Sequence, residues 1–113
     1  MLYDKRWDEQ IQQVKGIADL LNRAADVIKR NGWCQDTAVD DKNRMCMVGA
    51  LSHVVHQHDA GYTRDDIVKA EDILKDYLDV NSVVSWNDRF NMKLFFGKQR
   101  AINALRKAAA RVV

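Results

Sequence analysis

Hydrophobic residues recur at steps of three and four along much of the chain, which is the period of an amphipathic helix. The first such stripe predicts a helix from Trp7 to Arg30, ended by Gly32. Gly16 is a point at which this helix could divide into two, because glycine costs about 1 kcal/mol inside a helix. The stripe consists of Ile11, Val14, Ala18, Leu21, Ala25 and Ile28.

Three more helices are expected farther along the chain. Asn43 can cap a second helix that runs to about His56, and residues 58–61 then form a turn. A third helix spans about 64–79, because Thr63 to Asp66 resembles a capping box. The last helix runs from about Asn91 to Val113, with a bend possible at Gly97. Its expected buried face comprises Phe95, Ile102, Leu105, Ala109 and Val112.

Residues 80–86 are the most strand-like stretch, since Val83 and Val84 are β-branched. A short two-stranded element, formed by residues 33–43 with 80–86, is therefore an open alternative to a loop. The pattern as a whole predicts a mainly α fold, namely a compact bundle of four to five helices.

Composition supports this prediction. The chain has 113 residues, 47% of them hydrophobic and 30% charged, with no proline and five glycines. A chain of this length is typical of one domain, so we expect a single domain over residues 1–113. We expect it to be helical, because β-sandwiches need more turn residues. No apolar run approaches the roughly 20 residues of a membrane helix, and Met1 to Arg6 is not a secretory signal. Two cysteines make no disulfide framework, so a reducing cytoplasm is expected.

Charge is unevenly distributed along the chain. The net charge is +2, yet no Asp or Glu follows Arg89, so residues 89–113 carry +7 and residues 1–88 carry −5. Such a segment could bind nucleic acid, or it could simply be neutralised by the acidic first part of the fold. Its basic residues are Arg89, Lys93, Lys98, Arg100, Arg106, Lys107 and Arg111.

Two groups of side chains are candidates for chemistry. Cys46 would lie in the first turn of the second helix, where backbone N–H groups and Arg44 lower a thiol pKa, and a histidine or Asp88 could serve as its base. Both Cys34 and Cys46 could equally be small buried apolar residues. The spacing of His53, His56 and His58 does not demand a metal ion, and we expect no metal site and no cofactor.

Two polar segments, each headed by a tryptophan, could meet at one end of the bundle as a binding site. The first is Trp33, Cys34 and Gln35, and the second is Trp86, Asn87 and Asp88. Asn87 and Asp88 could also simply cap the last helix, and Trp86 could anchor the core.

These segments carry a resemblance to a known family. Gly32-Trp33-Cys34-Gln35, Cys46-x-x-Gly49-Ala50-Leu51 and Val84-x-Trp86-Asn87-Asp88 resemble, in order and spacing, a family of short uncharacterised proteins of actinobacteria and phages. The resemblance covers about residues 17–110 and implies no activity, substrate or cofactor. The link to phages would suit a protein that acts on a host protein.

Three functions stay open at this stage. The first is a non-enzymatic inhibitor or adaptor that binds a partner protein and no membrane. The second is a cysteine-dependent hydrolase or transferase that uses Cys46. The third is a nucleic-acid accessory protein that uses the basic last helix.

Overall fold

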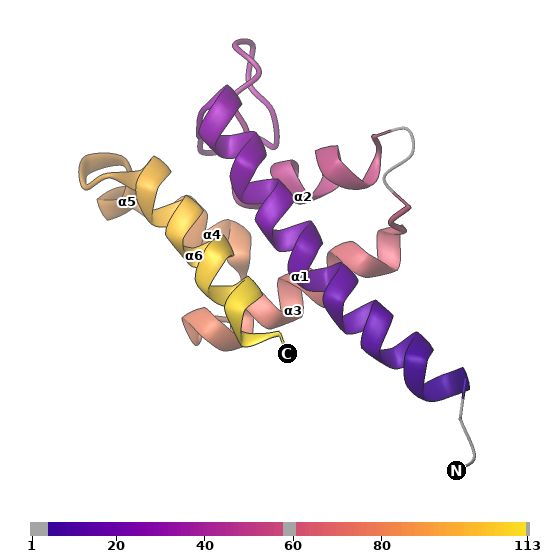
Figure 1. Ribbon diagram of the computed structural model, residues 1–113. Coiled ribbons are helices and arrows are strands. Elements are labelled where there is room, and N and C mark those ends of the chain that lie inside the picture. Colours follow the sequence, from indigo (N-terminus) through magenta and orange to yellow (C-terminus); the bar gives the residue numbers. More distant parts are fainter. Residues whose placement is uncertain (1–4, 58–60, 113) are drawn as a thin grey trace.

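The computed structural model describes residues 5–57 and 61–112, with side chains described from residue 16 onward. These residues form six helices and two isolated β-bridges, which confirms a mainly helical fold and exceeds the expected four to five helices (Figure 1). The helices are α1 (Lys5–Asn31), α2 (Met47–Val55), α3 (Arg64–Leu78), α4 (Val83–Asn87), α5 (Phe90–Leu94) and α6 (Gly97–Arg111).

The first helix is continuous, so the division considered at Gly16 does not occur. A Cβ atom at Gly16 would meet only Tyr62 Cε1, at 3.8 Å, so no close contact requires glycine there. Farther along α1, Leu21, Ala25 and Ile28 of the predicted stripe are fully buried, whereas Ala18 is only partly buried. The side chains of Ile11 and Val14 lie outside the described residues. The last turn carries Lys29 and Arg30, and Gly32 ends the helix with φ +104°.

The second helix begins later than predicted, because Cys46 and not Asn43 is its cap. Cys46 Sγ accepts a hydrogen bond from the Gly49 N–H. Asn43 instead lies in a left-handed turn with φ 61°, and its N–H donates to the carbonyl of Asp40. The third helix has the predicted capping box between Thr63 and Asp66. The turn proposed for residues 58–61 falls mostly outside the described residues.

The strand considered for residues 80–86 is wrong. Ser82 caps a short helix, since its Oγ accepts from the Ser85 N–H at 3.1 Å, and Val83–Asn87 forms α4. Helical spacing buries Val83 and Trp86 on one face, which overrides the β preference of the two valines. Residues 33–43 do not pair with this segment. Trp33 and Val39 instead form single bridges with Met45.

The last helix is also not continuous. The chain breaks between α5 and α6 at Phe95 and Phe96, and Phe96 is left-handed with φ 59°. Phe95, expected in the core, is 59% exposed because it lies in this break. Of the other predicted inward positions, Ile102, Leu105 and Ala109 are buried and Val112 is partly buried.

The core lies between α1 and α6, which pack along each other, and α1 also contacts α2 (Figure 1). Alanines make the close approach of α1 and α6 possible, because small side chains let two helix backbones come near each other. Within the described residues, no helix is long and apolar enough to cross a membrane. The buried alanines of α1 and α6 are Ala24, Ala25, Ala101, Ala104, Ala108 and Ala109.

Candidate functional site

The two tryptophan-headed segments meet, as the sequence led us to expect. Trp33 Nε1 donates to Asn87 Oδ1 at 2.8 Å, and Asn87 Nδ2 donates to the carbonyl of Cys34 at 3.1 Å. Gln35 Nε2 donates to the carbonyl of Asn87 at 3.0 Å. We call this network of Trp33, Cys34, Gln35 and Asn87 the clasp. It joins the loop after α1 to the end of α4.

Asn87 is the centre of the clasp and is only 1% exposed. Met45 donates its N–H to the carbonyl of Gly32 and accepts from the N–H of Cys34, as in parallel strands. The next bond of that pattern would run from the Met47 N–H to the Cys34 carbonyl. The carboxamide of Asn87 occupies this place, because Oδ1 accepts from Met47 N at 3.2 Å and Nδ2 donates to Cys34.

The clasp leaves no buried polar side-chain atom unpaired in the described part of the chain. Gln35 Nε2 also donates to the carbonyl of Arg89 at 2.9 Å. The carboxylate of Asp88 accepts from the Asp36 N–H at 3.1 Å and from Asn87 Nδ2 at 2.9 Å. Asp88 is therefore occupied in holding the loop and does not reach a cysteine thiol by any of these bonds.

A glycine allows the loop to lie directly on α2. A Cβ atom at Gly49 would lie 2.1 Å from the carbonyl oxygen of Ala38, which real contacts do not show. The same carbonyl accepts a hydrogen bond from the Cys46 N–H at 3.1 Å. Gly49 is thus required by a close backbone approach and not by catalysis.

Trp33 links the clasp to the break between α5 and α6. A Cβ atom at Gly97 would lie 2.4 Å from Cζ3 of the Trp33 indole and 2.5 Å from the carbonyl oxygen of Met92. The edge of the indole therefore rests on the first residue of α6, while its N–H is held by Asn87. A side chain at position 97 would therefore clash with the indole at the point where the chain turns between α5 and α6.

Comparison with known proteins gives a family for the chain. Residues 13–111 match a family described as a family of unknown function, DUF6197. The chain belongs to this family. No curated protein and no solved structure matches it.

The thiols of this DUF6197 protein differ from the activated cysteine that the sequence suggested. Cys34 and Cys46 are free and buried. Burial raises the pKa of Cys46 above its usual value, and hydrogen bonds from the Gly49 and Val48 N–H groups offset only part of this effect. Burial also raises the pKa of Cys34. The prediction of a lowered pKa for Cys46 is wrong, because the sulfur is buried where it caps α2. Arg44, which was expected to help lower it, instead pairs with Asp40 at 2.6 Å.

The histidines form no cluster among the described residues. His56 Nδ1 lies 2.7 Å from the carbonyl of Ser52, and His53 Nε2 lies 3.4 Å from Gln57 Nε2. Both rings are exposed at the end of α2, and His58 lies outside the described residues. Across residues 5–57 and 61–112, no three His, Cys, Asp or Glu side chains could hold a metal ion together.

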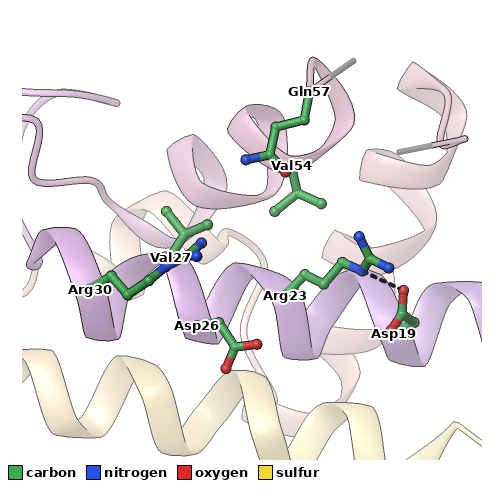
Figure 2. Close-up of a pocket in the computed structure, with 7 residues that line it drawn as sticks. All are labelled: Asp19, Arg23, Asp26, Val27, Arg30, Val54 and Gln57. Atoms are coloured by element: carbon green, nitrogen blue, oxygen red, sulfur yellow. Dashed lines mark hydrogen bonds and ion pairs between the residues drawn. The ribbon is translucent and has the colours of Figure 1, made fainter. Parts of the chain in front are cut away.

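Ion-paired side chains line two hollows among the residues that the structure describes. Figure 2 shows the first, of about 390 Å³, between α1 and the end of α2, with Asp19 paired to Arg23 at 2.7 Å. The second, of about 460 Å³, lies beside the clasp. Its lining residues are Trp33, Cys34, Gln35, Asp36, Asp40, Asp41, Arg44 and Lys93.

The seven cations of the last segment divide into two groups. Three are engaged within the fold: Arg106 with Asp26, Arg111 with Asp76, and Arg100 above the Trp86 ring at 5.9 Å. The other four, Arg89, Lys93, Lys98 and Lys107, are exposed. The acidic first part of the chain thus neutralises part of the segment, as one of the two interpretations of its charge proposed.

An exposed apolar surface, which the hydrophobic pattern did not predict, lies on α5 and the break that follows it. Phe90 is 77% exposed and Phe96 is 82% exposed, and Leu94 and Phe95 are also exposed. We call these four residues the phenylalanine corner. They include all three phenylalanines of the chain. That concentration, within seven residues, is the signal that could have revealed it, whereas helical periodicity placed Phe95 inside.

Proposed function

We propose that this protein is a non-enzymatic binding protein, of the inhibitor or adaptor type, that docks on a partner protein through the phenylalanine corner. The observation that carries this proposal is the exposure of all three phenylalanines at one place. Large contiguous apolar patches on soluble proteins generally mark interaction sites, and aromatic side chains dominate the energy of interfaces.

The backbone at Phe96 supports the same proposal. A bulky residue at φ 59° costs about 1 kcal/mol or more, which an exposed side chain does not recover within the fold. In this proposal the clasp is the scaffold of the site. The Trp33 indole packs on Gly97 and so keeps the preceding Phe95 and Phe96 pointing outward. The residues Trp33, Cys34, Gln35, Trp86, Asn87 and Asp88 then position the surface and do not themselves contact the partner.

Site-specific photo-crosslinking tests this function. A benzophenone amino acid replaces Phe96 in cells that produce the chain, and a matched variant carries it at Val68, an exposed apolar position on α3. We expect one discrete adduct at position 96 and none at position 68. The crosslinked protein is then purified and titrated calorimetrically with the wild-type chain and with Phe90→Ser.

The titration should give a 1:1 complex that Phe90→Ser weakens by about 2 kcal/mol, or about thirtyfold. The proposal fails if no adduct forms at position 96, or if position 68 gives the same adducts. It also fails if the purified protein binds Phe90→Ser as tightly as it binds the wild type.

A further inference from the structure

We infer that the partner offers an apolar pocket whose rim carries acidic side chains. This inference rests on the proposed function and adds the chemistry of the surface that the phenylalanine corner meets. The corner lies at an outer end of the molecule, where α5 turns back into α6 (Figure 1). A protruding group of large apolar side chains is buried best in a concave surface, and such pockets hold the energetic centre of many interfaces.

The charges around the corner define the rim of that pocket. Arg89, Lys93 and Lys98 are exposed, and each lies within two residues of one of the exposed apolar side chains in the sequence. None of the ion pairs formed by the described residues uses these three cations. Charge complementarity across an interface then favours carboxylates on the partner.

A second copy of the chain is a poor occupant. A symmetric dimer would place the same patch on both sides of the interface, so both sides would carry the basic residues Arg89, Lys93 and Lys98. Like charges brought together in this way oppose association.

A nucleic acid also fits the surroundings less well than a protein does. Lys93 lines the same hollow as Asp36, Asp40 and Asp41. A phosphate backbone carries negative charge along its whole length and would pass close to these carboxylates. A protein can instead place one carboxylate opposite each cation and leave the neighbourhood of the three aspartates neutral or basic.

The test combines the crosslinker at position 96 with charge reversal. The full chain carries Arg89→Glu, Lys93→Glu and Lys98→Glu together, and the matched control carries Lys69→Glu on the exposed side of α3. Circular dichroism checks that both variants remain folded. We expect the triple variant to lose the adduct at least about tenfold, and the control to keep it, after nuclease treatment of the cells' extract.

Two further measurements examine the other occupants. A fluorescein-labelled 20-nucleotide thymidine strand is titrated at low salt, and the chain alone is sedimented over a range of concentrations. We expect no binding of the strand and a monomer throughout.

Each alternative result has its own meaning. A full adduct in the triple variant overturns the acidic rim and leaves the proposed function intact, whereas no adduct in the parent overturns both. Strand binding that Phe96→Ser removes assigns the corner to nucleic acid, and a dimer that Phe96→Ser dissociates assigns it to a second copy. Either of these last two results overturns the inference.

Discussion

The contact between α1 and α6 and the clasp hold the molecule together by opposite means. Between the helices, many buried alanines and leucines share the contact. In the clasp, one carboxamide satisfies the indole of Trp33, the carbonyl of Cys34 and the N–H of Met47. Stability at the helix contact is therefore distributed, whereas at the clasp it is concentrated in Asn87.

The largest expected effect tests this concentration. Asn87→Leu removes the hydrogen-bond partner of the Trp33 indole N–H, the Cys34 carbonyl and the Met47 N–H. Each buried group left unpaired costs about 1–3 kcal/mol. We expect a loss of about 4 kcal/mol in the free energy of unfolding, measured by urea denaturation. Leu105→Ala, in the centre of α6, should cost less, about 3 kcal/mol.

Asn103→Leu is the matched control, because Asn103 is exposed and bonds only Gln99 among the described contacts. It should change stability by less than about 0.5 kcal/mol. A smaller loss for Asn87→Leu than for Leu105→Ala would mean that the clasp contributes no more than an ordinary core position.

The second prediction compares one substitution at two glycines. Gly49→Ala forces a Cβ atom against the Ala38 carbonyl, 2.1 Å away, and should destabilise the fold by about 3 kcal/mol. Gly16→Ala adds the same atom inside α1, where Tyr62 is 3.8 Å away, and should stabilise it by about 0.5–1 kcal/mol. If both substitutions changed the free energy of unfolding in the same direction in urea denaturation, Gly49 would be no more constrained by its neighbours than Gly16.

The helices and the clasp also differ in how far the sequence could predict them. The apolar stripe of α1 and the capping box at Thr63 are local, repeated signals, and the structure follows both. The sequence also suggested that the segments of Trp33 and Asn87 could meet, and the two side chains are hydrogen-bonded in the structure. It could not show that the Asn87 amide bridges the Met47 N–H and the Cys34 carbonyl, because that depends on segments far apart in the chain.

The two errors have different physical causes. Val83 and Val84 favour a strand by their side-chain type, but the local Ser82 cap and the burial of Trp86 accompany a short helix. Phe95 fits the period of the last helix, but the chain breaks there, where the indole of Trp33 lies against Gly97. A contact between segments this far apart is not visible in the hydrophobic pattern, and this is why the phenylalanine corner was not foreseen.

The third prediction concerns the left-handed backbone at Phe96, next to the residue on which the Trp33 indole of the clasp lies. Phe96→Asn should stabilise the protein by about 1 kcal/mol, because asparagine accepts the left-handed backbone and the lost side chain is 82% exposed. Phe95→Asn, next to it at φ −126°, should change stability by less than about 0.5 kcal/mol. Thermal denaturation measures both. A destabilised Phe96→Asn would show that the Phe96 ring packs within the fold.

The smallest expected effect lies on the other side of the molecule, where Tyr62 donates a hydrogen bond to Asp19 on α1. Burial, and then this bond and the charge of Asp19, raise the pKa of Tyr62 above its usual value. A raised pKa in the folded state adds stability below the unfolded pKa of about 10, and this stability is lost as pH rises through the folded pKa. Urea denaturation should therefore show about 0.5 kcal/mol less stability at pH 11 than at pH 8, since solvent screens the pair. Tyr62→Phe should remove this difference, whereas Tyr77→Phe, which keeps the bond to Asp19, should retain it. An unchanged difference in Tyr62→Phe would mean that the contact between Tyr62 and Asp19 contributes no stability that depends on pH.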